Sequence, residues 1–324
     1  MTSFGAKLAL CVTLGVPLYA LLRQTIRRSR RLRVLPRAKE RVLVLGASSG
    51  IGRSVAEQYA AQGARVCVVG RRENEIQAVE NACLELRTKH HADNSARPAI
   101  GLVADFSNPE DMVRVRQELE NAWQGVDTVI VCAGASALRP VMEIAREKSS
   151  GKGYPATDDV QRTVDVAIAA ERANYVGPLV SAVTFIPLLQ STSVSPSILL
   201  VSSLGAIVPA PTRAIYGSTK SAGLLLYQAL AIENPTIKFS FMIPATVEGN
   251  FRASAVDAGT VREADPNQFG LKREDVAQRC IQAVDFEEKA IFMPGWGKIT
   301  HLLYWLWPSA IERIAMRKYN FTHQ

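Results

Sequence analysis

A phenol and an ammonium group, those of Tyr216 and Lys220, lie four residues apart in the stretch YGSTK. On a helix, positions i and i+4 lie on one face, so both groups can reach a common target. A neighbouring ammonium group lowers the pKa of a phenol, which makes the phenol a better proton donor and acceptor near neutral pH. The same spacing also occurs on ordinary helices, so the rest of the chain must decide between an acid–base pair and a structural one.

Short apolar runs alternate with longer helical segments from residue 41 onward. The runs are rich in Val and Ile, which is typical of strands buried on both faces of a parallel sheet. They lie at 41–45, 65–69, 99–103, 127–131, 197–201 and 237–243, with helical segments at 51–62, 73–91, 109–123, 160–190 and 214–233. This alternation predicts an α/β fold, a Rossmann-type doubly wound parallel sheet in a single domain over residues 41–295. A polar insert at 149–155 precedes the longest helix, and we expect a mobile loop there.

Three glycines, Gly46, Gly50 and Gly52, lie between the first predicted strand and the first predicted helix in the stretch GASSGIG. Glycines at this place serve a tight turn, a close approach of the backbone to a pyrophosphate, and close packing of helix on strand. The helix that follows directs free amide groups and the positive end of its dipole at the phosphates. The position and the spacing together predict a dinucleotide site.

The second predicted strand leads into Arg71 and Arg72. An NAD site has an acidic residue here for the ribose 2′-hydroxyl, whereas a 2′-phosphate favours a cation. The two arginines therefore favour NADP(H), and the alternative is a solvated helix start. Asp105, just past the third strand, is either a helix N-cap or a contact for adenine.

Together these parts resemble the short-chain dehydrogenase/reductase family over about residues 41–250. The glycine turn is similar to the family's glycine signature, and Ser203, Tyr216 and Lys220 match its catalytic set, with Ser203 thirteen residues before Tyr216. Asn174, in the stretch RANYVGP, matches the family's fourth catalytic residue, and Asp105 matches its adenine contact. The layout resembles most the membrane-anchored reductases of this family, which act on steroids, retinoids or sphingoid ketones.

The resemblance implies a reaction in which NADPH delivers hydride to a carbonyl carbon. Tyr216 would donate the proton, Ser203 would hydrogen-bond the carbonyl oxygen, Lys220 would lower the pKa of the phenol and hold the nicotinamide ribose, and Asn174 would hold a relay water. The residues expected to contact the cofactor are Gly46, Ser48, Ser49, Gly50, Ile51, Gly52, Arg71, Arg72, Asp105, Ala133, Gly134, Asn174, Tyr216, Lys220, Pro244 and Val247.

Two positions depart from the family pattern. Cys132 stands where members usually have the Asn of Asn-Ala-Gly, and a thiol is a poorer hydrogen-bonding group. Gly249, in the stretch PATVEG, stands where a Thr is expected to hold the carboxamide, and Thr246 and Asn250 are the candidate substitutes. Both changes concern the geometry of the cofactor site and leave the acid–base residues intact.

The net charge of +8 is local. Residues 23–41 hold nine Lys or Arg and one Glu, a surplus of eight, so the rest of the chain is neutral. A nucleic-acid surface is more often spread over a folded face, and we expect no nucleic-acid partner. Five widely spaced cysteines without a CxxC motif, and four scattered histidines, argue against a disulfide framework and a metal centre.

Both ends of the chain indicate a membrane. Residues 8–22 carry no charge, and counting from Phe4 with Lys7 reaching towards the headgroups extends the apolar length to nineteen. We therefore expect a membrane anchor at 1–22 and a basic linker at 23–40, with the catalytic domain facing the cytosol at the endoplasmic reticulum. A helix that enters one leaflet is the main alternative, and a buried core helix is the weaker one.

The C-terminal segment, residues 296–324, holds Trp296, Trp305 and Trp307 within amphipathic elements that break at Pro308. Aromatic residues with interleaved cations are typical of a membrane interface. The alternative is a terminal helix that docks on the domain or on a second subunit.

The sequence favours a membrane-anchored NADP(H)-dependent carbonyl reductase for a lipophilic substrate. The resemblance further implies a homodimer through the helices near 160–190 and 214–233. The alternative is a non-catalytic, NADP-binding regulatory or scaffold protein at a membrane, for which the changes at Cys132 and Gly249 would mark lost activity. An epimerase or dehydratase on this fold is a third class, but no sugar-specific residue supports it.

Overall fold

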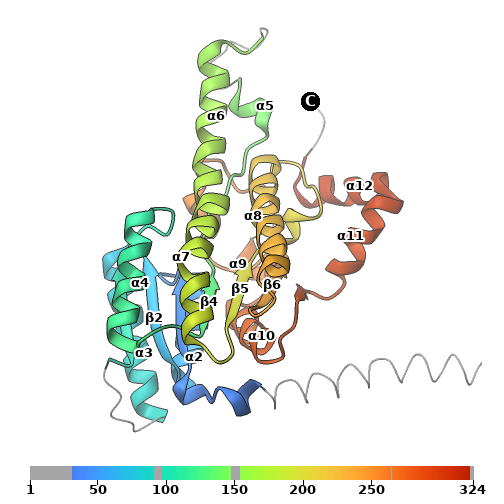
Figure 1. The fold of residues 1–324 in the computed structure, drawn as a ribbon. Helices are drawn as coiled ribbons and strands as arrows, with labels where there is room; N and C mark the ends of the chain where they lie inside the picture. The colour runs from blue at the N-terminus through green and yellow to red at the C-terminus, as the bar shows by residue number, and fades with distance from the viewer. Residues whose placement is uncertain (1–30, 91–96, 147–153, 264, 322–324) are drawn as a thin grey trace, which may run out of the picture.

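The computed structural model describes residues 31–90, 97–146, 154–263 and 265–321 (Figure 1). Its centre is a parallel sheet of seven strands in the order β3-β2-β1-β4-β5-β6-β7. The strands are β1 (Arg41–Leu45), β2 (Arg65–Gly70), β3 (Ala99–Val103), β4 (Thr128–Val131), β5 (Ser197–Val201), β6 (Lys238–Pro244) and β7 (Ala290–Met293). The strand order reverses between β1 and β4, and ligands of such sheets bind beside the carboxyl ends of the strands at this point.

Helices cover both faces of the sheet, as the predicted doubly wound fold requires. Side chains alternate along each strand, so Val42 and Val44 belong to one core cluster while Leu43 and Leu45 belong to the other. The first cluster lies under α2 (Gly50–Ala61), α3 (Glu73–His90) and α10 (Arg273–Asp285), and the second under α4 (Pro109–Trp123), α7 (Gly177–Thr192) and α8 (Ala214–Glu233).

The remaining elements lie at the edges of this core. They are η1 (Arg37–Lys39), α5 (Val141–Ile144), α6 (Thr157–Glu171), η2 (Arg172–Val176), η3 (Leu204–Ala206), η4 (Phe251–Ser254), α9 (Pro266–Phe269), α11 (Gly297–Leu306) and α12 (Pro308–Lys318). The helix predicted over 160–190 is thus three successive pieces, α6, η2 and α7, and α6 rises beyond the sheet in Figure 1. The break between α11 and α12 falls before Pro308, as predicted, because proline cannot continue a helix.

The helical stretch Thr157–Thr192 is, within the described residues, long and apolar enough to cross a membrane. Its second half carries Phe185 and Leu189, which are fully buried against the sheet. We therefore assign this stretch to the core of the domain. The predicted anchor at 1–22 lies outside the described residues, as does most of the predicted mobile insert at 149–155.

Residues 31–40, the end of the predicted basic linker, pack under the amino ends of the strands. Arg31 is 1% exposed, and its Nη2 atom donates to Glu40 at 3.1 Å and to the Thr128 hydroxyl at 3.0 Å. Arg37 bonds Glu40 and both carboxylate oxygens of Asp285, the latter at 2.6 and 2.7 Å. Burial alone would raise the pKa of Glu40, but the two arginines lower it below its usual value. This network fastens the segment to the domain.

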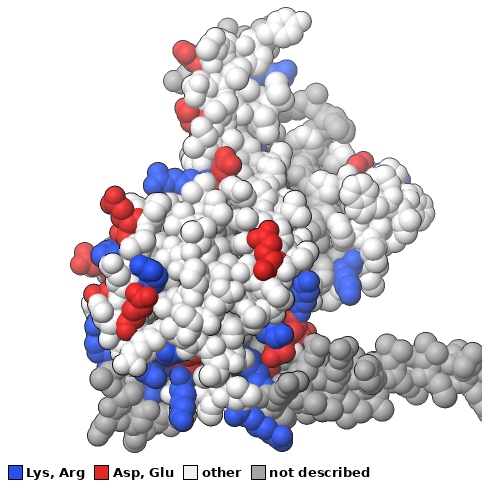
Figure 2. Space-filling model, in the orientation of Figure 1, with Lys and Arg blue, Asp and Glu red and all other residues white. Residues whose placement is uncertain are grey.

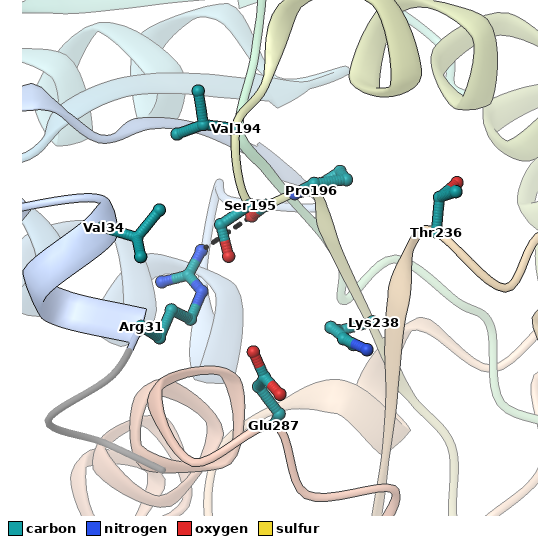
Figure 3. A pocket seen from close by; sticks show the side chains of 8 residues that line it. All are labelled: Arg31, Val34, Val194, Ser195, Pro196, Thr236, Lys238 and Glu287. Carbon is teal, nitrogen blue, oxygen red and sulfur yellow. Dashed lines mark hydrogen bonds between the residues drawn. The ribbon is translucent and has the colours of Figure 1, made fainter.

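A shallow cavity lies at the same end of the sheet, beside Arg31 (Figure 3). Its lining includes Pro196 and Lys238, which lie at the amino ends of β5 and β6. The cavity is therefore at the opposite end of the strands from the predicted chemistry, and we do not assign the reaction to it.

Candidate active site

The glycine turn between β1 and α2 closes against the loop that follows β4. Gly46 has a φ of +86°, and a Cβ atom there would lie 2.5 Å from the amide nitrogen of Ala133. A Cβ atom at Gly52 would collide with the Gly46 carbonyl group. At Gly50, with a φ of +59°, a Cβ atom would meet nothing within 4 Å among the described residues. The open side of the turn therefore adjoins the amide groups that begin α2, which fits a pyrophosphate.

Arg72 lies at the rim of this turn. Its Nη2 atom donates hydrogen bonds to the hydroxyl oxygens of Ser48 and Ser49, each at 2.9 Å. Arg71 is exposed beside it, and the half-buried Ile51 packs against the core. The guanidinium group is thus placed where the ribose that adjoins the pyrophosphate is expected.

Asp105 organises the loop after β3 and does not cap a helix. Its Oδ1 atom accepts hydrogen bonds from the amide and the hydroxyl of Ser107, at 2.9 and 2.7 Å. The N-cap of α4 is Asn108, whose side chain accepts from the amide of Glu110 at 2.8 Å. The N-cap alternative for Asp105 is therefore wrong, and the adenine contact stays a prediction.

Ser203 and Tyr216 meet beside the carboxyl end of β5, because two backbones approach closely there. Ser203 caps η3, and its hydroxyl accepts from the Gly205 amide at 3.1 Å. A Cβ atom at Gly205 would lie 3.5 Å from this hydroxyl and 3.6 Å from the Tyr216 ring, so the two side chains border the same glycine. A Cβ atom at Gly217 would lie 2.7 Å from the Gly205 carbonyl oxygen. Glycine at position 217 thus lets the start of α8 bring the phenol to the serine.

Lys220 lies behind this pair and is 7% exposed. Its Nζ atom donates to the Val201 carbonyl at 3.3 Å, and a Cβ atom at Gly134 would lie 2.9 Å from the same nitrogen and 2.8 Å from Oδ1 of Asn174. Lys220, Asn174 and Gly134 therefore converge at one point. Burial lowers the pKa of Lys220 to about 8, while burial raises the pKa of the neighbouring Cys132 to about 12.

Asn174 lies in η2, a π-helical turn that interrupts the helix between α6 and α7. Such turns are frequent at functional sites. Its Oδ1 atom accepts from the Ala135 amide at 3.0 Å, and its Nδ2 atom donates to the Ala135 carbonyl at 2.9 Å and the Thr219 hydroxyl at 3.0 Å. The side chain thereby joins the loop after β4 to the residue that precedes Lys220.

The loop after β6 follows Pro244, the last residue of the strand, and is bonded to residues 266–271. Val247 pairs with Leu271 in an isolated parallel bridge, and the Gly249 amide donates to Oδ1 of Asn267 at 2.9 Å. Gly249 has a φ of +107°, a conformation that a β-branched residue rarely adopts. The backbone of this loop therefore explains why Thr does not occupy position 249.

The model of a known family, described as short chain dehydrogenase, matches residues 40–258. The chain belongs to this family. Dehydrogenase/reductase SDR family member 7B of Danio rerio is 27% identical over 298 residues, which cover 88% of this chain and 87% of that protein. The 11-beta-hydroxysteroid dehydrogenase 1A of Arabidopsis thaliana is 24% identical over 281 residues, which cover 84% and 73% of the two chains.

Solved structures show the same short-chain dehydrogenase fold at low identity. A short chain dehydrogenase/reductase from Burkholderia phymatum in complex with NAD aligns with a TM-score of 0.68 at 17% identity, over 84% of this chain and 95% of that one. An alcohol dehydrogenase from the archaeon Thermococcus sibiricus complexed with 5-hydroxy-NADP gives a TM-score of 0.61 at 19% identity, over 78% and 95%. These structures show the fold alone; the family match makes the chain a member of an oxidoreductase family in which a nicotinamide dinucleotide is the expected cofactor.

Sequence reasoning missed a group of charged residues around Tyr216 in this short-chain dehydrogenase. Arg213, at the N-cap of α8, lies with its Cζ atom 5.7 Å from the centroid of the Tyr216 ring. Glu263 and Arg252 come from the segment after β6, and Tyr319 comes from the end of α12. The spacing of Arg213 and Tyr216, three residues apart at a helix start, was a signal for the first of these; no local pattern indicates the others.

Proposed function

We propose that this chain is an NADP(H)-dependent oxidoreductase that interconverts a carbonyl group and a secondary alcohol on a lipophilic substrate at a membrane. The observation that carries the proposal is that Ser203 and Tyr216 both border Gly205, while Lys220 and Asn174 converge at Gly134. These groups lie at the carboxyl ends of the strands, on the side of the glycine turn. The arrangement supports acid–base chemistry beside a dinucleotide.

The bound nicotinamide supplies or accepts hydride at the substrate carbon. Tyr216 donates its proton to the carbonyl oxygen during reduction, and Ser203 hydrogen-bonds the same oxygen as negative charge develops on it. Burial raises the pKa of Tyr216, so the phenol carries the proton that reduction consumes at neutral pH. Asn174 holds the Ala135 backbone and Thr219, and so fixes the direction of Lys220 towards the cofactor side.

The choice of NADP(H) rests on Arg71 and Arg72. Both are exposed, and Arg72 already donates to Ser48 and Ser49 at the rim of the glycine turn. A planar guanidinium group there suits a 2′-phosphate, and the end of β2 offers no carboxylate for a ribose hydroxyl. The residues present therefore fit NADP(H).

The lipophilic substrate and the membrane are supported by the apolar face of α11 and α12. The large exposed apolar side chains on these elements are Trp296, Ile299, Leu302, Leu303, Trp305, Leu306, Trp307 and Ile314. The ring of His301 is hydrogen-bonded to the Ile207 carbonyl at 2.9 Å, just after η3, so α11 adjoins the Ser203 loop. A face of this size rimmed by cations suits a lipid interface and would deliver an apolar ketone to the site. The relatives that are named 11-beta-hydroxysteroid dehydrogenases agree with this class of substrate.

We also propose a homodimer through α7 and α8. Val183, Leu225 and Ile232 are at least two-thirds exposed on these helices, at 69%, 67% and 75%. Few charged side chains lie over α7 and α8 in Figure 2. An exposed surface of this kind is suited to a second copy of the chain.

The proposal is tested by incubating the purified full chain in detergent with NADPH and a panel of sterol, sphingoid and retinoid ketones. Consumption of the reduced cofactor, absent in the Tyr216→Phe variant, is the expected result. The second candidate, a non-catalytic NADP-binding protein, is favoured by Cys132 and Gly249. Cofactor binding without turnover of any ketone in the panel would support that candidate instead.

A further inference from the structure

A cation, the guanidinium group of Arg213, lies over the ring of Tyr216. The Cζ atom of Arg213 is 5.7 Å from the ring centroid, and Phe251 meets the same ring edge-on with centroids 6.1 Å apart. Arg213 is 6% exposed, and its Nη1 atom donates to the Ser136 hydroxyl at 3.0 Å and the Ala137 carbonyl at 3.2 Å. The guanidinium group is therefore held in place by the loop after β4 and cannot swing into solvent.

Glu263 joins Arg213 to a second arginine. Both carboxylate oxygens accept from Nη2 of Arg213 at 2.9 Å, and one accepts from Nε of Arg252 at 3.0 Å. The side chains of Arg213, Glu263 and Arg252 are 6%, 5% and 13% exposed. We call these three residues the charged triad. Two cations share one carboxylate in it, so a positive excess remains beside the phenol.

The other groups that face Tyr216 come from three elements. Ser203, the N-cap of η3, borders Gly205 together with the Tyr216 ring, and Tyr319 and Lys318 approach the triad from the end of α12. Lys220, on α8, is directed to the Val201 carbonyl and to the Cys132 side. Arg213 is therefore the cation over the phenol ring, and Arg252 is joined to it through Glu263.

We propose that the charged triad of Arg213, Glu263 and Arg252 positions Tyr216 and stabilises its ionised form during proton transfer. The two arginines favour the phenolate that remains after the proton has passed to the carbonyl oxygen, and Glu263 limits this effect. Burial raises the pKa of Tyr216, the arginines oppose the rise, and Glu263 adds to it. The role assigned to the triad rests on the proposed acid–base function of Tyr216, but its electrostatic effect exists without a substrate.

The test is an absorbance titration of tyrosinate in the full chain without substrate or cofactor. Each variant is compared with the same variant carrying Tyr216→Phe, so the difference reports residue 216 and removes Tyr319 and the other tyrosines. Arg252→Gln should raise the pKa of Tyr216, and Glu263→Gln should lower it, each by about one unit. Arg213→Lys keeps the charge and should leave the pKa close to that of the parent chain.

The opposite signs separate an electrostatic role from a structural one. Loosening of the site would move the pKa of Tyr216 in the same direction in Arg252→Gln and Glu263→Gln; that result, or no shift in either, overturns the proposal. Arg252→Gln is the decisive variant because Arg252 is the more exposed of the two arginines, so its loss should disturb the fold least. Circular dichroism of this variant checks that it folds. If the two variants shift the pKa of Tyr216 in opposite directions but the chain reduces no ketone, the electrostatic role of the triad stands and the proposed function is refuted.

Discussion

Two tyrosines, the fully buried Tyr59 and the half-buried Tyr216, each have an arginine over the ring, at opposite ends of the sheet. The Cζ atom of Arg37 is 4.8 Å from the Tyr59 ring centroid, and that of Arg213 is 5.7 Å from the Tyr216 centroid. Burial raises the pKa of Tyr59 well above its usual value, and its hydroxyl has no hydrogen-bond partner among the described residues. Tyr216, in contrast, has the Ser203 hydroxyl nearby, across Gly205.

The charges around the two rings also differ. At the amino end of the strands, Arg31 and Arg37 face two carboxylates, those of Glu40 and Asp285. At the carboxyl end, two arginines share Glu263 alone. A balanced set of buried charges holds a segment in place, whereas an unbalanced set acts on its neighbour. An arginine over a tyrosine is thus a packing contact at one end, and we propose that it serves chemistry at the other.

The strongest way to break this comparison is to remove each hydroxyl in turn. Tyr216→Phe should lower turnover about a thousandfold, because the proton donor is lost, while NADPH binding is retained. Tyr59→Phe should leave turnover unchanged, since the hydroxyl of Tyr59 makes no hydrogen bond within the described part of the chain. Steady-state rates and quenching of protein fluorescence by NADPH measure the two quantities. Equal losses in both variants would remove the distinction between the two ends.

The balanced network predicts a large effect on stability at the amino end. Glu40→Gln leaves Arg31 and Arg37 with one carboxylate between them and should lower the free energy of unfolding by about 3–5 kcal/mol. Glu57→Gln, which breaks the exposed pair with Arg53, is the control and should cost less than about 1 kcal/mol. Unfolding by denaturant measures both, and a similar cost for the two would show that the network contributes little.

The pH dependence of unfolding tests the direction of the Glu40 contribution to stability. The pKa of Glu40 is lowered in the folded chain from a usual value of 4.5, so its carboxylate stabilises the fold above that pH. This contribution should disappear as the pH falls through the lowered folded value, and Glu40→Gln should lack that part of the acid dependence. Denaturant midpoints between neutral and acidic pH, for both chains, provide the measurement.

Removing a charge at the carboxyl end should have the opposite effect on stability. Burial lowers the pKa of Lys220 from 10.5 to about 8, so the ammonium group destabilises the fold at neutral pH. Lys220→Met should therefore raise the free energy of unfolding by about 2–3 kcal/mol at pH 7 and abolish turnover. The gain should vanish above the usual pKa of lysine, where both states are neutral. A destabilised variant at pH 7 would show that the charge of Lys220 is compensated.

The smallest expected effect concerns the cofactor. Arg72→Ala should raise the KM for NADPH about tenfold and leave the KM for NADH unchanged, because a charge-assisted contact to a 2′-phosphate is lost. Lys238→Ala, at the cavity beside the amino ends of the strands, is the matched control and should change neither value. An equal rise in the KM for NADPH and for NADH after Arg72→Ala would show that Arg72 supports the glycine turn and does not contact the 2′-phosphate.

Much of the fold could be predicted from the pattern of apolar residues. The predicted strands at 41–45, 99–103 and 197–201 and the predicted helices at 109–123 and 214–233 have the bounds seen in the structure. The strand β7 was missed because four residues, Ala290–Met293, carry too short a pattern. The helix over 160–190 was predicted as continuous, since a π-helical turn at Asn174 leaves the apolar spacing almost unchanged.

The candidate site divides in the same way. Ser203, Tyr216, Lys220 and Asn174 lie in local motifs, and the structure places them near one another, while their catalytic roles stay a proposal. Glu263 lies fifty residues from Arg213. The ion pair between Glu263 and Arg213 forms because the segment after β6 folds over the loop after β4. No local spacing in the sequence predicts this pair. Sequence reasoning gave Lys220 the electrostatic effect on Tyr216, which stays a prediction, and it missed Arg213, whose guanidinium group lies over the phenol ring.

The left-handed backbone at Gly249 has a consequence for substitution in this loop. Restoring the threonine that relatives are expected to carry would place a β-branched residue at a φ of +107°, although the space around a Cβ atom is open among the described residues. The obstacle to reversion is thus the path of the main chain and not crowding. A threonine at position 249 therefore requires the loop to be reshaped as well, so a single substitution there is not enough.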